Sequence, residues 1–162
     1  MVRLLQPHNV VSIESLKKVG VIGFSMERLP RISRAQSMDV LSSQANLAGY
    51  KAVLMAAHAY PKLMPMLMTA AGTIKGEGVV VMGVGVAGLQ AIATAKRLGT
   101  VVEATDVRPE TKEQVESLGA KFIEVPITDD EQELAKGEGG YAKEMSEDYK
   151  QRQADLIAER LK

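Results

Sequence analysis

Three glycines with a fixed spacing mark the segment of this sequence where chemistry can most readily be placed. Gly83, Gly85 and Gly88 form the pattern GxGxxG directly after a valine-rich apolar run. The first glycine permits a tight turn, the second lets the backbone come close to a pyrophosphate, and the third lets a new helix pack against a sheet. A helix that begins with Val86 and Ala87 offers free N–H groups to phosphate oxygens. The pattern therefore predicts a turn that binds the phosphates of a dinucleotide.

An acidic residue follows the glycines at the distance expected for ribose recognition. Asp106 stands 18 residues after Gly88, where a carboxylate accepts hydrogen bonds from the hydroxyls of the adenosine ribose. Its charge repels a 2′-phosphate and favours NAD over NADP, but the nearby Arg108 tempers this preference because an arginine can accommodate that phosphate. Val107, between the two, belongs to the same predicted site. The glycine pattern alone also fits a plain strand-to-helix turn, whereas glycines, helix and distal acid in register favour a dinucleotide site.

The elements around these residues predict an α/β fold with a Rossmann-like parallel sheet. Residues 79–82 and 101–106 read as strands, and residues 86–98 between them carry helical periodicity. A second helix is expected to begin at Pro109, and a third strand covers 121–125. The order β-α-β-α-β is one mononucleotide-binding half of a doubly wound sheet, and the other half is missing.

The segment before the glycines predicts a long helix and part of another lobe. From Ser37 onward, apolar residues recur every three or four positions for about 20 residues, which corresponds to a helix of roughly 30 Å and suits a strut between lobes. We therefore expect three parts: residues 1–36 as a remnant of a first lobe, residues 37–74 as linking helix and connector, and residues 75–162 as a truncated nucleotide-binding domain. Taken by itself, the arginine-rich loop 26–34 fits a turn that is exposed to solvent.

Composition narrows the function classes. The chain has 162 residues, with 20 basic and 20 acidic side chains and no cysteine. A zero net charge does not favour nucleic acid or anionic membrane as a partner, and the lack of cysteine removes disulfides and thiolate metal sites. His8 and His58 have no second ligand at metal-binding spacing, so no metal site is expected. No apolar stretch is long enough to span a bilayer, and we expect a soluble protein.

Several longer strings resemble one known family. They are PRISRAQSMD at 30–39 with the helix pattern from Ser42 to Tyr50, MTAAGT at 68–73, GVAGLQAIATAKRLG at 85–99, DVRPETKEQVESLGAKF at 106–122 and GGYAKEMS at 139–146. Together they resemble the NAD(H)-binding component of proton-translocating NAD(P) transhydrogenase, in the alanine dehydrogenase/transhydrogenase superfamily. The resemblance covers most of the chain from about residue 30, and strings of this length are far more specific than a glycine pattern.

The resemblance implies an architecture, an activity and partners. In that family two Rossmann-like lobes are joined by long helices, and NAD(H) lies in the cleft between them. Hydride passes directly between NADH and NADP⁺ held on a separate domain, and this transfer is coupled to proton movement through a membrane domain. The expected partners are therefore the NADP(H)-binding domain, the membrane domain and a second copy of the chain. The expected location is the cytoplasmic or matrix side of the membrane, attached through partner subunits.

The resemblance also assigns residues near the nicotinamide. Arg31, Gln36 and Asp39 match the family's loop beside that ring, and Ser42 belongs to the helix start that accompanies it. The side-chain amide of Gln36 and the carboxylate of Asp39 can hydrogen-bond the carboxamide of the nicotinamide. Arg31 can pair with Asp39 or with a phosphate. Tyr141 matches a tyrosine of the family's mobile loop. No general base or metal is demanded, because the cofactor itself carries out hydride transfer.

Two other functions remain open on the sequence. An alanine dehydrogenase would need a substrate-binding lysine and a catalytic histidine from the family's first lobe, which the sequence lacks, and the loop from Arg31 to Asp39 favours transhydrogenase. A non-catalytic nucleotide-binding or assembly fragment is favoured by the missing parts of both lobes. The methionine-rich segment before the glycines predicts an apolar surface and hence self-association, with a homodimer as the expected form.

Overall fold

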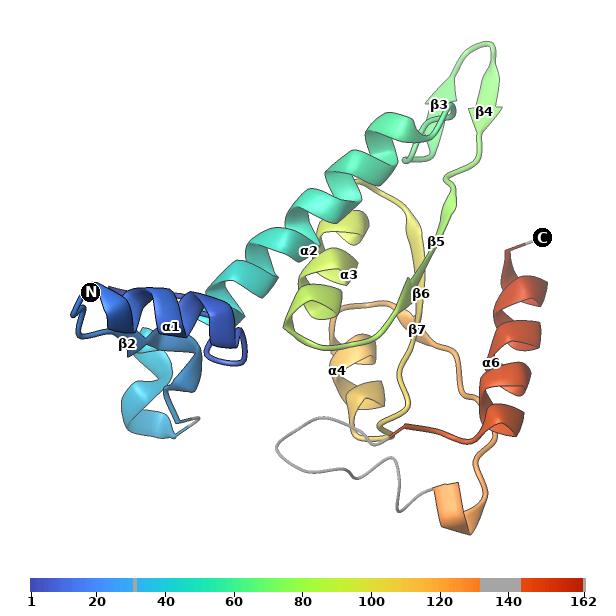
Figure 1. Ribbon diagram of the computed structural model, residues 1–162. Helices are drawn as coiled ribbons and strands as arrows, with labels where there is room; N and C mark the ends of the chain where they lie inside the picture. The colour runs from blue at the N-terminus through green and yellow to red at the C-terminus, as the bar shows by residue number, and fades with distance from the viewer. Residues whose placement is uncertain (31, 132–143, 162) are drawn as a thin grey trace. The chain divides into compact units, whose positions relative to one another are not determined.

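A computed structural model describes residues 1–30, 32–131 and 144–161 (Figure 1). The chain divides into two compact units, Met1–Asn46 and Leu47–Lys162. The division falls inside helix α2 (Val40–Ala59), which is the long helix expected from the sequence, begun three residues later than the periodicity indicated. The expected division into three parts at residues 36 and 74 stays a prediction.

The first unit is built from short elements. They are β1 (Val2–Arg3), α1 (Val10–Lys18), β2 (Phe24–Ser25) and the 3₁₀ turns η1 (Met26–Arg28) and η2 (Ser33–Met38). Strands β1 and β2 pair in parallel. The Glu27 carboxylate holds the segment after β1, because it accepts hydrogen bonds from the backbone N–H groups of Leu5 (2.9 Å) and Gln6 (2.5 Å). The two 3₁₀ turns η1 and η2 begin within residues 26–34, which were expected to form a plain loop.

The second unit contains a hairpin that the sequence did not predict. Strands β3 (Leu67–Thr69) and β4 (Gly72–Ile74) pair antiparallel where only a connector was expected. Gly72 takes a positive φ of 143°, which only glycine adopts without strain. The hairpin was not predicted because its small residues lack the alternating β-branched side chains by which strands are usually recognised.

The dinucleotide-type sheet forms as expected from the sequence. Its strands and helices are β5 (Gly78–Met82), α3 (Val86–Arg97), β6 (Val101–Thr105), α4 (Thr111–Ser117), β7 (Lys121–Phe122) and the later helix α6 (Glu147–Arg160). The strands are parallel in the order β5-β6-β7, with Gly78 opposite Val101 and Glu103 opposite Lys121. The predicted α/β class with one β-α-β-α-β half is confirmed.

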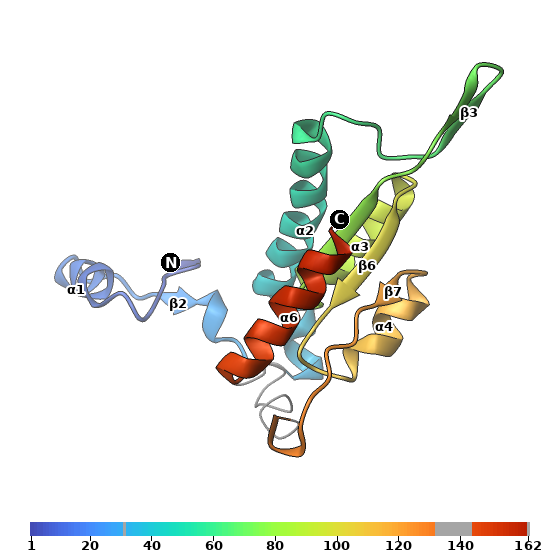
Figure 2. The same ribbon diagram turned by 90° about the vertical axis from the view of Figure 1, so that its right-hand side faces the viewer.

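Helices cover both faces of this sheet. Figures 1 and 2 show α3 and α4 on one face and α6 on the other. The larger core lies beneath α3 and α4 and includes these buried residues: Val53, Val84, Ile92, Ala95, Val102, Ala104, Val115 and Ala120. A smaller cluster under α6 contains Val125, Met145 and Tyr149. The carboxyl ends of β5 and β6 are thereby held in fixed register.

Two expected boundaries were wrong by a few residues. Strand β7 ends at Phe122 and not at Val125, and α4 begins at Thr111 and not at Pro109. Pro109 instead lies in a turn, because both the N–H and the hydroxyl of Thr111 bond back to the carbonyl of Arg108, at 3.2 and 2.7 Å. The turn after Asp106 is thus fixed by its own hydrogen bonds.

Helix α2 meets the first turn of α3 at a glycine. Gly49 is buried, and a Cβ built on it would collide with the backbone carbonyl of Ala87. Val53, one turn further along α2, joins the core beneath α3. Gly49 therefore lets α2 press directly on the residues that begin α3, where the glycine turn ends.

We predict that Gly49→Ala destabilises the chain. Alanine in a helix interior normally stabilises by about 0.5–1 kcal/mol relative to glycine, but overpacking against backbone costs about 1–3 kcal/mol and should exceed it. Thermal unfolding followed by circular dichroism measures the net effect. The matched control is Gly78→Ala in β5, where the added methyl meets nothing within 4 Å. A Gly49→Ala variant as stable as the parent would show that the helices do not press together here.

Candidate nucleotide-binding site

The glycine turn connects β5 to α3 with the geometry that its residues require. Gly83 takes a φ of 90°, a conformation that disfavours side chains, and its N–H donates to the carbonyl of Thr105 (2.9 Å). A Cβ on Gly88 would collide with the carbonyl of Gly83, so this glycine permits the close return of α3 onto the turn. A Cβ on Gly85 would meet nothing within 4 Å. The first and third glycines serve the fold, whereas the space beside the second is open.

The start of α3 presents its amides without a side-chain cap. Its N-cap is Gly85, and no side chain among the described residues hydrogen-bonds there. Val86 and Gly85 are exposed, and Ala87 is half-buried. The first N–H groups of a helix lack intrahelical partners and carry a partial positive charge. Among the described residues, no side chain caps these amides or lies within 4 Å of a Cβ placed on Gly85, as phosphate binding requires.

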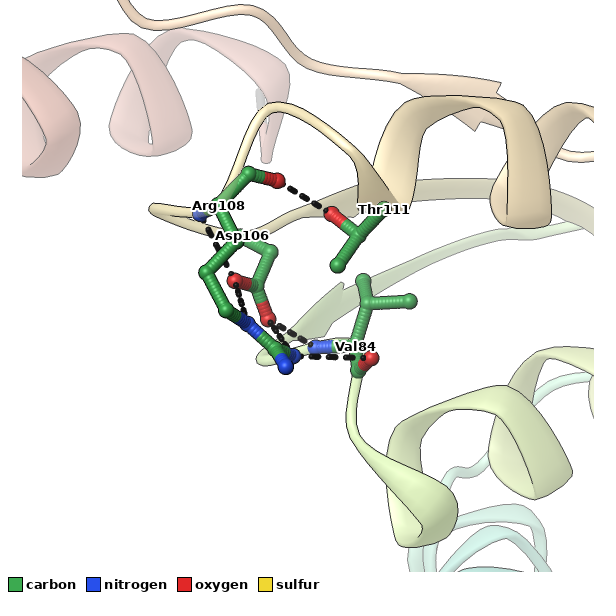
Figure 3. A network of polar contacts seen from close by, with 4 residues as sticks. All are labelled: Val84, Asp106, Arg108 and Thr111. Atoms are coloured by element: carbon green, nitrogen blue, oxygen red, sulfur yellow. Dashed lines mark hydrogen bonds and ion pairs between the residues drawn. The ribbon is translucent and has the colours of Figure 1, made fainter. Parts of the chain in front are cut away.

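Asp106 lies directly against this turn (Figure 3). Its Oδ2 accepts hydrogen bonds from the backbone N–H of Val84 (2.6 Å) and from Nη2 of Arg108 (3.1 Å). Its Oδ1 accepts from the N–H (2.9 Å) and Nε (3.0 Å) of Arg108. Arg108 Nη2 also donates to the carbonyl of Val84 (3.2 Å). The predicted ribose acid and the predicted phosphate turn are thus joined by the chain's own hydrogen bonds.

This network keeps Asp106 ionised. Burial by itself raises the pKa of the Asp106 carboxyl, but the hydrogen bonds from Arg108 and Val84 and the charge of Arg108 outweigh burial and leave the pKa below its ordinary value. The side chain of Asp106 is only 8% exposed, and that of Arg108 is 19% exposed. The sequence indicated a carboxylate open to ribose and an arginine open to phosphate, whereas the structure pairs the two side chains with each other.

A cavity of about 250 Å³ opens beside Asp106 at the carboxyl ends of β6 and β7. Its lining includes Val107, Pro126, Ile127 and Tyr149. Burial raises the pKa of Tyr149, whose ring is fully covered, so the phenol stays neutral at physiological pH. Asp106, Lys112 and Glu124 also line this cavity, and a mostly apolar hollow with a few polar groups fits a flat base joined to a sugar. Sequence analysis singled out Val107 but missed Ile127 and Tyr149, which carry no motif of their own.

A buried acid ties the start of α6 to the segment before it. The Glu131 side chain accepts hydrogen bonds from Ser146 Oγ (2.5 Å), from the N–H of Thr128 (2.9 Å) and from Arg152 Nη2 (2.6 Å). Ser146 in turn caps α6 by accepting from the N–H of Tyr149. These bonds, that of Ser146 foremost, lower the pKa of Glu131 to about 2 from the ordinary 4.5. We call Glu131, Ser146 and Arg152 the Glu131 clasp.

Residues expected beside the nicotinamide belong to the first unit. Asp39 caps α2: its Oδ1 accepts from the N–H of Ser42 (3.0 Å) and its Oδ2 accepts from the Ser42 hydroxyl (2.6 Å). Gln36 is exposed, and with Asp39 it lines a cavity of about 210 Å³. The structure thus brings Gln36, Asp39 and Ser42 together. Arg31 and Tyr141 lie outside the described residues.

Within the described part of the chain, no three metal-ligating side chains gather into a site. Nor does that part contain a helix long and apolar enough to cross a membrane.

Comparison with known proteins identifies the family of this chain. Residues 52–162 match the family described as Alanine dehydrogenase/PNT, C-terminal domain. The chain belongs to this family. It is 58% identical over 149 residues to an NAD(P) transhydrogenase subunit alpha protein of Rhodospirillum rubrum, a match that covers 92% of the chain and 38% of that protein. The corresponding protein of Rickettsia prowazekii is 53% identical over 163 residues, which cover the whole chain and 42% of the relative.

A solved structure agrees. This alanine dehydrogenase/PNT family chain superimposes on the crystal structure of transhydrogenase from Sinorhizobium meliloti with a TM-score of 0.79 and 51% identity, over 98% of the chain and 41% of that structure. The resemblance drawn from the motifs is confirmed. The chain spans about two fifths of the length of these relatives.

The Glu131 clasp makes stability depend on acid pH. A carboxyl whose pKa is lower in the folded than in the unfolded chain stabilises the fold fully above the unfolded pKa, and the contribution is lost as the pH falls. We predict that Glu131→Gln is less stable than the parent at neutral pH, and that the difference shrinks as the pH falls from 4.5 to about 2. Urea midpoints over that range measure it.

The matched control for the clasp is Glu147→Gln. Glu147 also lies at the start of α6, but its ion pair with Lys150 (2.7 Å) is exposed to solvent. Exposed pairs contribute about 0–1 kcal/mol, so this variant should unfold like the parent. A constant difference between parent and Glu131→Gln at every pH would contradict an ionised clasp.

Proposed function

We propose that this chain is the NAD(H)-binding part of a proton-translocating NAD(P) transhydrogenase. In this role it holds NAD(H) while hydride passes to or from NADP(H) on a separate domain. One observation carries the proposal: the Asp106 carboxylate accepts a hydrogen bond from the amide of Val84 inside the open glycine turn. That bond holds the acid and the glycine turn next to each other, which supports their use as the ribose acceptor and the pyrophosphate site of a dinucleotide. The curated relatives named NAD(P) transhydrogenase supply the reaction class.

The residues fit the adenosine half of NAD(H). The pyrophosphate would lie beside Gly85 and the amides that begin α3, where space is open and the helix dipole favours negative charge. The ribose hydroxyls would donate to Asp106. Both oxygens of Asp106 already accept two bonds each, so the ribose must replace the side-chain bonds of Arg108. The adenine ring suits the cavity beside Val107 and Ile127.

For the nicotinamide half we propose Arg31, Gln36, Asp39 and Ser42, with Tyr141 closing over the bound nucleotide. The nicotinamide ring supplies the hydride. The side chains orient the ring: the Gln36 amide is exposed and can pair with the carboxamide of the ligand, and Asp39 is held in place by Ser42. Orientation is the protein's contribution, because direct transfer needs two rings at near-contact distance.

We propose as partners the NADP(H)-binding domain, the membrane domain and a second copy of the chain. Support for the second copy comes from large apolar side chains left uncovered near β3, such as Met66 at 59% and Met68 at 74% exposure. Such side chains are costly to leave in water and mark association surfaces when they cluster. The protein would lie on the cytoplasmic or matrix side of the membrane and attach through its partner subunits.

The proposal predicts that Gly85→Ala loses NADH binding but not stability. The new methyl meets nothing in the free protein, yet it occupies the space where the backbone approaches the pyrophosphate. We expect affinity for NADH to fall about ten- to a hundredfold, the equivalent of the roughly 1–3 kcal/mol that such crowding costs. Titration of the purified chain with NADH, followed by nucleotide fluorescence, measures this.

Gly78→Ala serves again as the control, since its methyl is also unopposed but lies at the start of β5. It should bind NADH like the parent. Adding a separately made NADP(H)-binding domain and an acetylpyridine analogue of NAD⁺ then tests hydride exchange. Binding without exchange would make the chain a non-catalytic nucleotide-binding fragment, and absence of binding by the folded parent chain would overturn the proposal.

A further inference from the structure

The cavity proposed for the adenine ring has walls from two segments that lie far apart in the sequence. Ile127 comes from the segment after β7, and Tyr149 comes from the first turn of α6. Tyr149 is buried in a small apolar cluster with Val125 and Met145, and Ile127 packs against that cluster. The shape of the cavity therefore depends on what holds these two segments together.

The Glu131 clasp is bonded to a neighbour of each wall. On one side, the Glu131 carboxylate accepts from the N–H of Thr128 (2.9 Å), the residue that directly follows Ile127, and the N–H of Glu131 donates to Thr128 Oγ1 (3.4 Å). On the other side, the carboxylate accepts from Ser146 Oγ (2.5 Å), and Ser146 Oγ accepts from the N–H of Tyr149 (3.1 Å). One carboxylate thus links the backbone beside Ile127 to the backbone of Tyr149.

Arg152 adds a contact to the ring of the second wall. Its Nη2 donates to the Glu131 carboxylate at 2.6 Å, and its guanidinium carbon lies 5.8 Å from the centroid of the Tyr149 ring. A cation at this distance over an aromatic face is attracted to it. The Glu131 side chain is only 7% exposed, so solvent screens its bonds little. The clasp therefore acts on the orientation of the Tyr149 ring as well as on the start of α6.

Local capping does not require this arrangement. Ser146 alone satisfies an N–H at the start of α6, as N-cap serines do. The reciprocal bonds between Thr128 and Glu131 have the form of a capping box, which is complete without any other residue. Neither motif accounts for one buried carboxylate that serves both and is also paired with Arg152. The sharing joins the two walls of the cavity into one unit.

We propose that Glu131 is a positioning residue for nucleotide binding: it holds Ile127 and Tyr149 where the adenine ring is to fit between them, and it does not itself contact the ligand. This inference rests on the proposed binding of NAD(H) and adds a residue outside the glycine turn and the ribose acid. A cavity whose walls are already ordered binds with a smaller loss of conformational entropy. Without the clasp, the ligand has to order the walls, and its affinity falls.

The test measures NADH affinity of the full chain and its variants by nucleotide fluorescence, at a temperature at which circular dichroism shows each variant folded. We expect Glu131→Gln to bind NADH about three- to tenfold more weakly, because walls that shift lose part of their van der Waals contact with the base. Ser146→Ala should weaken binding in the same way, and Ser146→Thr, which keeps the hydroxyl, should restore it. Glu147→Gln, which breaks only an exposed pair at the start of α6, should bind like the parent.

A double-mutant cycle separates positioning from a general loss of stability. In a chain that already carries Ile127→Ala, one wall is gone, so Glu131→Gln should cost little further affinity. In a chain that carries Gly85→Ala, which alters the pyrophosphate side, Glu131→Gln should keep its full cost.

The same factor in both backgrounds would overturn the inference, since a purely structural role does not depend on the wall. Parent-like affinity of folded Glu131→Gln and Ser146→Ala would overturn it too, as would failure of both variants to fold. A folded parent chain that binds no NADH would instead refute the proposed function itself.

Discussion

The hydrogen bond from the amide of Val84 to Oδ2 of Asp106, 2.6 Å long, connects the two places on which any nucleotide site in this fold depends. One end lies in the turn after β5, and the other lies at the end of β6. Because these strands pair in register up to Met82 and Thr105, their ends arrive side by side and the bond needs no distortion. The close return of α3 at Gly88 and the pressure of α2 at Gly49 then fix where the amides of the turn point.

In the free protein this bond belongs to a saturated network. A carboxylate offers about four lone-pair sites, and Asp106 uses them on Val84 and Arg108. In the proposed site, ligand binding is an exchange in which ribose hydroxyls replace the guanidinium of Arg108. Exchange of one good hydrogen bond for another yields little net free energy, so the affinity must come from the phosphates and the base. The proposal therefore gives Asp106 a role in selecting and aligning the ligand more than in binding strength.

The sequence predicts the nucleotide half of the fold because its signals are local. Glycines at 83, 85 and 88, a β-branched run before them and helical periodicity after them each point to one backbone conformation, and the structure follows. The hairpin at β3 and β4 could not be predicted, because it depends on a glycine turn and small residues with no alternation. The pairing of Arg108 with Asp106 was also missed: the Asp106 carboxylate accepts from the N–H of Arg108 two residues on, and the guanidinium of the same residue bonds to it as well.

Asp39 shows that an acid at a proposed binding site can also have a structural role in the free protein. Its carboxylate caps α2 through the amide and hydroxyl of Ser42, a task that by itself accounts for an acid three residues before a serine at a helix start. That task also fixes the carboxylate in one orientation beside Gln36 and the neighbouring cavity. A capping side chain can contact a ligand with little further loss of conformational entropy, because it is already ordered before the ligand binds. Asp106 follows the same principle in the second unit: each acid is first a structural acceptor, and in the proposed site the ligand meets a carboxylate that is already ordered.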